Sequence, residues 1–168
     1  SLALKNYMKN NIFKNKKILI TGATGSVGTA LIKELMENYS FKVIRAMSND
    51  EHGLFILKSN IKKNYSSFEE LTKTQKIRLM HGDIRSKERC IEVSKDVDIV
   101  IHAAAMKHVD ICEYNPQEAI ATNVLGTENI VNASIKNNIQ KFVLVSTDKA
   151  VSPNTIMGTS KLMAEKIV

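Results

Sequence analysis

Tryptophan is absent from this sequence of 168 residues, and proline and cysteine occur only twice each. Cys90 and Cys112 stand apart without the C-x-x-C spacing of a zinc site or redox motif, so we expect neither a disulfide framework nor a metal site. The longest apolar run, residues 99–106, is interrupted by His102 and is much shorter than the roughly 20 residues that span a bilayer. No continuous apolar segment follows the N-terminal lysines, so no signal peptide is indicated, and a cytoplasmic location is the default expectation.

Charge is unevenly distributed along the chain. The net charge is +7, but residues 1–17 hold five lysines and no acid, and a second basic strip lies within residues 58–78. That strip lacks the interleaved aromatic residues of a base-stacking surface, and a lysine-rich arm such as residues 1–15 is typical of a solvated tail. We therefore expect no nucleic-acid partner.

Hydrophobic periodicity predicts one domain over residues 16–168 in which strands and helices alternate. Short apolar runs predict five strands: residues 16–22, 41–47, 77–81, 98–104 and 141–146. Longer helical patterns predict further elements: residues 26–38, 86–95, 116–137 and a last helix that begins near residue 156. Such alternation is typical of an α/β fold with a doubly wound, Rossmann-type parallel sheet in the order 3-2-1-4-5. Because the chain stops within a helix, we expect a domain truncated before its last strand or strands.

A glycine-rich turn follows the first predicted strand and opens the first helix. Its glycines, at positions 22, 25 and 28, suit a tight turn, close approach of the backbone to a pyrophosphate and close packing of helix on strand. The N–H groups and dipole of the helix N-terminus favour phosphate. The spacing G-x-x-G-x-x-G differs from G-x-G-x-x-G, but the strand–turn–helix context predicts a dinucleotide site. The cofactor-binding candidates in this turn are Gly22, Thr24, Gly25, Ser26, Val27 and Gly28.

The end of the second strand is where dinucleotide-binding folds select NAD or NADP. Ser48 and Asn49 stand there, with no acid directly at the strand end to bind a ribose 2′-hydroxyl. Asp50 comes slightly late, and the nearest cation is Arg45 within the strand. This pattern favours NADP, with NAD as the alternative.

Two further strand ends are predicted to line the cofactor. Asp83 and Ile84, after the third strand, are placed to meet an adenine, although Asp83 could equally cap the next helix. After the fourth strand, Ala103, Ala104 and Ala105 are small enough for a ribose to lie against the backbone, a feature that also serves close packing.

These residues, taken with later segments, resemble one family: the extended short-chain dehydrogenase/reductases that act on nucleotide sugars. Within that family the chain is most similar to the inverting UDP-N-acetylglucosamine 4,6-dehydratases and related polysaccharide-biosynthesis proteins. The resemblance covers residues 16–168 and implies a separate substrate domain that this chain lacks, so the chain alone is expected to be inactive. The motifs that carry it are TGATGSVG (21–28), HGDI (81–84), HAAAMKHVDICEYNP (102–116), TNVLGTENI (122–130), VSTDKAVSP (145–153) and MGTSK (157–161).

The resemblance implies an internal redox cycle. Hydride leaves C4 of the sugar for a nicotinamide, water is lost across C5 and C6, and the hydride returns at C6. Asp148 would be the acid for the departing hydroxyl and Lys149 the base at C5, which requires Asp148 to hold a proton and Lys149 to lose one. Without the surrounding motifs, the same two residues read as an exposed pair at a strand end.

Lys161 matches the family lysine that holds the nicotinamide ribose, but the tyrosine expected one turn earlier is Met157. Methionine has no ionisable proton, so the C4 proton would have to go to Asp148, Lys149 or Thr147 with a water. A branch of the family is similar in carrying M-x-x-x-K. The alternative is a degenerate, non-catalytic domain.

The resemblance also implies a sugar pocket lined by Lys107, His108 and Ser146, and a structural role for Asn123, which bonds backbone in this family. A homo-oligomer is implied for the full-length protein. Two other functions stay open: a UDP-sugar epimerase or reductase of the same fold, and a cofactor-binding module without catalysis.

Overall fold

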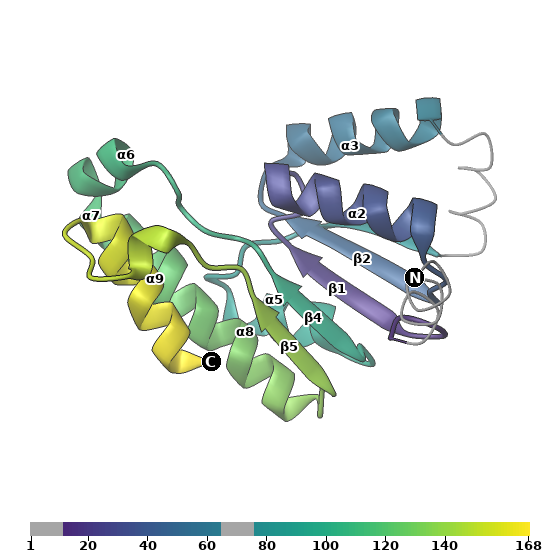
Figure 1. The fold of residues 1–168 in the computed structure, drawn as a ribbon. Coiled ribbons are helices and arrows are strands. Elements are labelled where there is room, and N and C mark those ends of the chain that lie inside the picture. Colours follow the sequence, from purple (N-terminus) through teal and green to yellow (C-terminus); the bar gives the residue numbers. More distant parts are fainter. Residues whose placement is uncertain (1–11, 65–75) are drawn as a thin grey trace, which may run out of the picture.

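The computed structural model describes residues 12–64 and 76–168 (Figure 1). Its centre is a parallel five-stranded sheet in the order β3-β2-β1-β4-β5, which confirms the predicted order. The strands are β1 Lys17–Thr21, β2 Val43–Ser48, β3 Ile77–His81, β4 Ile99–His102 and β5 Lys141–Leu144. The helical elements are α2 Ser26–Asn38, α3 Glu51–Asn64, α5 Lys87–Ser94, α6 Val109–Tyr114, α7 Pro116–Ala119, η1 Ile120–Leu125, α8 Gly126–Lys136, η2 Asp148–Ala150 and α9 Ile156–Ile167.

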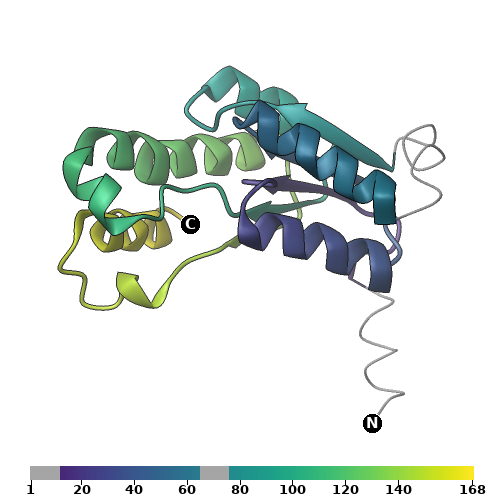
Figure 2. The same ribbon diagram turned by 90° about the horizontal axis from the view of Figure 1, so that it is seen from above.

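Helices cover both faces of the sheet, with α2 and α3 on one face and α5 and α8 on the other (Figures 1 and 2). The central strand β1 is apolar because its side chains are buried on both faces of the sheet. Ile18 and Ile20 pack toward α2 and α3, whereas Leu19, between them, packs toward α5 and α8. All three side chains are fully buried, as expected for a parallel strand covered on both sides.

The segment predicted as one helix over residues 116–137 is divided. A short α7 leads into the π-helical turn η1, and α8 follows without a break in the helical path. Asn123 lies in the π-helical turn, and the Thr127 hydroxyl donates to its carbonyl at 2.6 Å. Hydrophobic periodicity does not distinguish a π-helical turn from α-helix, and such turns are frequent at functional sites.

A third, smaller cluster of buried residues lies where α6, α7 and α9 meet. It consists of Cys112, Ala119 and Met157. Cys90 and Cys112 are both buried, and neither forms a disulfide. The basic arm predicted over residues 1–15 lies for the most part outside the described residues. Among the described residues we find no helix whose length and hydrophobicity suit it to cross a membrane.

Candidate active site

A cleft of about 430 Å³ opens at the carboxyl ends of the strands, where ligands of open α/β sheets bind. The structure brings nearly all of the predicted cofactor residues together there. Those lining the cleft are Gly22, Thr24, Gly25, Ser26, Val27, Gly28, Ser48, Asn49, Asp83, Ile84, Ala103, Ala104 and Ala105, with Lys107 from the predicted sugar pocket. The cleft is also lined by residues that the sequence analysis did not assign to it: Thr21, Met47, Asp50, Gly82, Arg85, Met106, Glu118 and Thr122.

The glycines of the turn are required for different reasons. Gly22 has φ of +67°, and a Cβ there would lie 2.6 Å from the backbone nitrogen of Ala104. A Cβ at Gly28 would lie 2.7 Å from the Cα of Ala23, so this glycine lets α2 pack on the turn. A Cβ at Gly25 would lie 3.3 Å from the Gly22 carbonyl oxygen, a tight contact but a longer one than those at Gly22 and Gly28. Packing therefore requires a glycine less strongly at position 25 than at 22 and 28, and close approach of a ligand gives Gly25 a further reason.

The N-terminus of α2 faces this turn. Its N-cap, Gly25, provides no side-chain hydrogen bond, and the first turn holds no acidic residue. The first N–H groups of the helix are thus available to an anion, and the helix dipole favours one. Gly25 has no side chain to keep a ligand away from the backbone, so this arrangement fits the pyrophosphate of a dinucleotide.

A buried polar chain supports the floor of the cleft. His102, 1% exposed, lies 2.6 Å from the Thr21 hydroxyl through Nδ1 and 3.0 Å from the Thr127 hydroxyl through Nε2. The Thr127 proton is given to the Asn123 carbonyl, so Nε2 must donate and Nδ1 must accept. Burial, with a smaller effect of the Lys161 charge, lowers the pKa of His102 to about 3. The imidazole is therefore neutral and holds Thr21, whose oxygen accepts from the backbone N–H of Ala104 at 3.3 Å.

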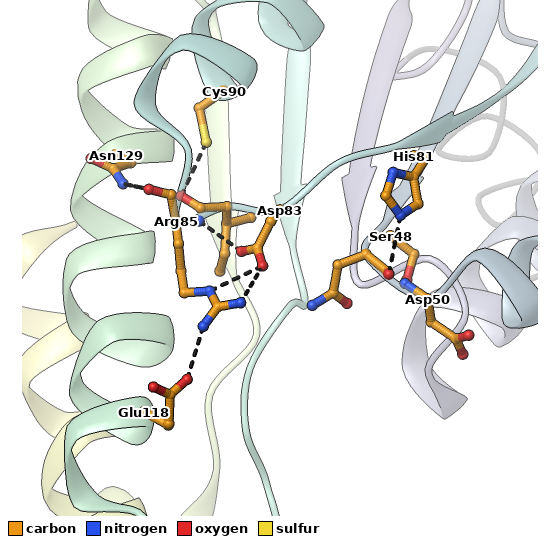
Figure 3. A network of polar contacts seen from close by, with 10 residues as sticks. Ser48, Asp50, His81, Asp83, Arg85, Cys90, Glu118 and Asn129 are labelled. Atoms are coloured by element: carbon orange, nitrogen blue, oxygen red, sulfur yellow. Dashed lines mark hydrogen bonds and ion pairs between the residues drawn. The ribbon is translucent and has the colours of Figure 1, made fainter.

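Asp83 does not cap the next helix. Ser86 does so, because its hydroxyl accepts from the backbone N–H of Arg89. Asp83 instead accepts from the Arg85 guanidinium at 2.7 Å, and Arg85 also reaches Glu118 of α7 at 2.8 Å (Figure 3). Burial alone would raise the pKa of Asp83, but hydrogen bonds and charge from Arg85 lower it. The carboxylate stays ionised and links two elements that border the cleft.

The end of β2 differs from what the sequence suggested. Ser48 shares a hydrogen bond with the Thr24 hydroxyl at 2.8 Å and accepts from the backbone N–H of Asp50 at 3.1 Å, so it shapes this turn. Arg45 points away from the cleft, because its guanidinium donates to the carbonyls of Val93 and Lys95 at 2.6 and 2.7 Å. Arg45, the nearest cation that the sequence offered for a 2′-phosphate, therefore does not reach the cleft.

The proposed proton-transfer residues lie in the turn after β5. The Thr147 hydroxyl donates to Asp148 at 3.0 Å, and the Lys149 ammonium lies 3.9 Å from the same carboxylate. The side chains of Asp148 and Lys149 are 90% and 56% exposed. The Thr147 hydrogen bond and the Lys149 charge lower the pKa of Asp148, which is opposite to the shift that an acid needs. Within the described residues, nothing covers this pair.

The remaining candidates, Lys161, Met157 and Ser146, lie on α9 and just after β5. Lys161 is 6% exposed and donates to the Val145 carbonyl at 2.6 Å. Burial lowers its pKa, against a smaller opposite effect of Glu165. The Ser146 hydroxyl donates to the Glu165 carboxylate. Met157 is 4% exposed in the cluster of α6, α7 and α9, where it packs and does not line the cleft.

Asn123 and His108 complete the set of predicted residues. Asn123 is 1% exposed, and its side chain bonds both backbone groups of Met106, at 2.8 and 3.0 Å, and the Ser160 hydroxyl at 2.9 Å. Asn123 thus has the structural role that the resemblance implied, because its side chain bonds backbone groups. His108 sits at the N-terminus of α6 without capping it through its side chain, outside the residues that line the cleft.

The family model for polysaccharide biosynthesis proteins matches residues 18–168. The chain belongs to this family. Its curated relatives include an uncharacterised membrane protein of Methanocaldococcus jannaschii, 42% identical over 94% of this chain. An inverting UDP-N-acetylglucosamine 4,6-dehydratase of Campylobacter jejuni is 42% identical over 93% of the chain, and a UDP-glucose 4-epimerase of Rickettsia canadensis is 40% identical over 93%. The chain spans 44% of the first of these relatives and 43% of the other two.

Solved structures agree with this family assignment. The structure of Pen from Bacillus thuringiensis superposes with a TM-score of 0.83 at 36% identity, over 94% of this chain and 45% of that one. DesIV, a dTDP-glucose 4,6-dehydratase from Streptomyces venezuelae solved with NAD bound, has a TM-score of 0.76 at 20% identity, over 90% of this chain and 50% of that one. The Rossmann-type fold shared by extended short-chain dehydrogenase/reductases is thus established for this family member.

Proposed function

We propose that this chain is the dinucleotide-binding part of a nucleotide-sugar 4,6-dehydratase in polysaccharide biosynthesis, of the UDP-N-acetylglucosamine type and C5-inverting. The observation that carries the proposal is the position of the Asp148–Lys149 pair. It follows β5 at the same edge of the sheet as the glycine-turn cleft. The 42% identity to the Campylobacter jejuni dehydratase supports the same chemistry.

A bound nicotinamide would supply hydride acceptance and return. In the proposed enzyme, this chain has the following roles. The glycine turn and the α2 N-terminus bind the pyrophosphate, and Lys161, behind the turn after β5, orients the nicotinamide ribose. Thr147, Asp148 and Lys149 hold and move protons at the sugar, and Lys107, His108 and Ser146 line the sugar site.

The electrostatics of the pair set a condition on this mechanism. The Thr147 hydrogen bond and the Lys149 charge lower the pKa of Asp148 and keep it ionised, whereas the acid role needs a protonated carboxyl. Covering the pair would take water from the carboxylate and raise the pKa of Asp148 toward the range that an acid needs. Bound sugar, cofactor and any domain that closes over them would provide this cover, so the active protonation states belong to the complex.

A UDP-sugar 4-epimerase is the second candidate, favoured by the Rickettsia canadensis relative. An epimerase needs no acid and base for elimination across C5 and C6, so the Asp148–Lys149 pair would have no role in it. A cofactor-binding module without catalysis is the third candidate, and the core packing of Met157 in place of a reactive tyrosine favours it.

The test uses the protein at its natural length, incubated with UDP-N-acetylglucosamine and trace dinucleotide, with the nucleotide sugar followed by mass spectrometry. Loss of one water supports the dehydratase. An unchanged mass with a new sugar configuration in the proton NMR spectrum of the same sample supports the epimerase. An unchanged sugar by both methods supports the non-catalytic module. As separate proposals, we place the protein in the cytoplasm and expect it to form a homo-oligomer.

A further inference from the structure

Lys161 of α9 is a buried cation with little around it to balance its charge. It is 6% exposed, and its ammonium donates to the Val145 carbonyl at 2.6 Å. Within the described part of the chain, this ammonium forms no ion pair. An ammonium has three N–H groups, so two of these donors remain after the bond to Val145. A buried charge with so few partners is unfavourable unless another group compensates for it.

The compensating group is Glu165, which stands one helical turn further along α9. Residues four positions apart lie on the same face of a helix, so its side chain follows that of Lys161. The Glu165 carboxylate accepts from the Ser146 hydroxyl, which keeps it beside the end of β5. Its negative charge raises the pKa of Lys161 and so opposes part of the larger, lowering effect of burial.

The two side chains of α9 bond adjacent residues of the chain. Lys161 bonds the backbone carbonyl of Val145, and Glu165 bonds the side chain of Ser146, the next residue. Two contacts at this spacing fix α9 against the end of β5 and fix the direction of the ammonium. The carboxylate cannot turn into solvent without breaking its hydrogen bond to Ser146.

The carboxylates on elements packed against α9 have other partners or are exposed. Glu113 of α6 accepts from the backbone N–H that begins α9, at 2.7 Å, and Glu118 of α7 bonds Arg85. Asp148 of η2 is 90% exposed, and the neutral His102 of β4 supplies no charge. The other charged side chains on α6, η2, α8 and α9, all exposed, are Asp110, Lys149, Glu128, Lys136 and Lys166.

We propose that Glu165 is a positioning residue, which acts by holding the Lys161 ammonium charged and directed toward the nicotinamide ribose. This inference rests on the proposed role of Lys161 in the dinucleotide site. The two N–H groups that Val145 leaves over match the two hydroxyls of a ribose. Ser146 anchors the carboxylate and, having given its proton to Glu165, can only accept from a sugar hydroxyl.

A double-mutant cycle on dinucleotide binding tests whether Glu165 acts through Lys161. NADH is titrated into the protein at its natural length, and the change in nicotinamide fluorescence gives the Kd of the unaltered protein, E165Q, K161M and the double variant. Glutamine keeps an oxygen that can accept from Ser146 but removes the charge. E165Q should weaken NADH binding about threefold to tenfold in the presence of Lys161, and by less than about 1.5-fold in K161M.

The matched control is E128Q, the same change at an exposed position of α8, which should leave the Kd of NADH within about 1.5-fold. Urea unfolding of each variant shows whether the fold is kept. E165Q should unfold at the same urea concentration as the unaltered protein, because its hydrogen bond to Ser146 remains.

A second measurement does not depend on the folding of K161M. The ¹³Cε resonance of Lys161 in lysine-labelled protein reports whether the amine carries its third proton. In E165Q this resonance should change to that of the neutral amine at a pH about 0.5 lower or more, because the compensating charge is gone. In E128Q it should titrate as in the unaltered protein.

The outcomes separate this inference from the proposed function. If E165Q binds NADH as tightly as the unaltered protein, the inference fails and the dinucleotide site stays in place. Equal losses from E165Q with and without Lys161, or an unchanged titration of Lys161, would show that Glu165 does not act through this lysine, which also overturns the inference. Failure of the unaltered protein to bind NADH overturns the proposed site, and the inference with it.

Discussion

The side-chain amide of Asn123 pairs with both backbone groups of Met106. Its Oδ1 accepts from the Met106 N–H at 2.8 Å, and its Nδ2 donates to the Met106 carbonyl at 3.0 Å. The π-helical turn that holds Asn123 is thereby tied to the loop after β4, which carries Ala103, Ala104 and Ala105 into the cleft. One buried side chain thus fixes a wall of the proposed cofactor site.

N123D tests this pairing with almost no change in shape. An ionised aspartate cannot donate, so the Met106 carbonyl and the Ser160 hydroxyl lose a partner and a charge is buried. The free energy of unfolding in urea should fall by about 2 kcal/mol or more. The control is N132D in the exposed part of α8, which should change stability by less than about 0.5 kcal/mol. Equal effects of the two substitutions would contradict the structural role of Asn123.

Stability should depend on pH through His102. Its folded pKa of about 3 lies below the ordinary value of 6.5 for the unfolded chain, so the unfolded state binds the proton more readily. The free energy of unfolding should therefore be unaffected by this residue above pH 6.5 and fall as pH drops toward 3. Between pH 6.5 and pH 5 the loss is about 2 kcal/mol.

The H102Q variant isolates this effect. Glutamine does not titrate, so the difference in stability between the unaltered protein and H102Q should shrink over the same interval. Urea unfolding at several pH values measures both curves. Parallel curves for the two proteins would show that His102 is not held neutral by the fold.

Alanine substitutions at Gly25 and Gly28 should distinguish a loss of cofactor affinity from a loss of stability. G28A places a Cβ 2.7 Å from the Cα of Ala23 and should lower the melting temperature by several degrees, with a loss of roughly 1–3 kcal/mol from overpacking. G25A places its methyl group 3.3 Å from the Gly22 carbonyl oxygen, a milder contact than that of G28A, so its melting temperature should fall by less. NADH affinity should nevertheless fall about tenfold or more in G25A, because the methyl group occupies the approach of the pyrophosphate. Unchanged NADH binding in G25A would argue against the glycine turn as the phosphate site.

Asp148 should be needed for dehydration and not for cofactor binding. In the protein at its natural length, D148N should lower kcat for water loss by about 10²–10⁴-fold, while the Kd of NADH stays within about twofold. The matched control is D96N, a carboxylate-to-amide change in the turn before β4, whose positive φ of 57° asparagine tolerates. A fall in kcat in D96N comparable to that in D148N would remove the specific role of Asp148.

The sheet and the glycine turn could be predicted from the sequence because their signals are local. A fully apolar β1, a glycine-rich turn and a periodic α2 follow each other directly, and one strand order satisfies the right-handed crossover rule. The small residues Ala103 and Ala104 were predicted to line the cofactor for the same local reason, and both line the cleft. Strand ends were predicted to within two residues. The remaining error arises because the frayed end of a strand leaves no pattern in the sequence.

The remaining features depend on contacts between distant parts of the chain. Arg85 and Glu118 meet across the cleft although 33 positions separate them, and neither position carries a local pattern. Arg45 was placed on the correct strand, but its carbonyl partners on and after α5 could not be predicted from alternation. The core position of Met157 depends on the packing of α9 against α6 and α7.

The central claim, an internal hydride cycle on a nucleotide sugar, is tested most directly with UDP-N-acetylglucosamine that carries deuterium at C4. The protein at its natural length is incubated with this substrate and trace dinucleotide, and the product is analysed by mass spectrometry and deuterium NMR. The account predicts a product that has lost one water, with the deuterium retained at C6. Recovery of sugar that keeps its full mass and its deuterium at C4, or a dehydrated product without deuterium at C6, would contradict it.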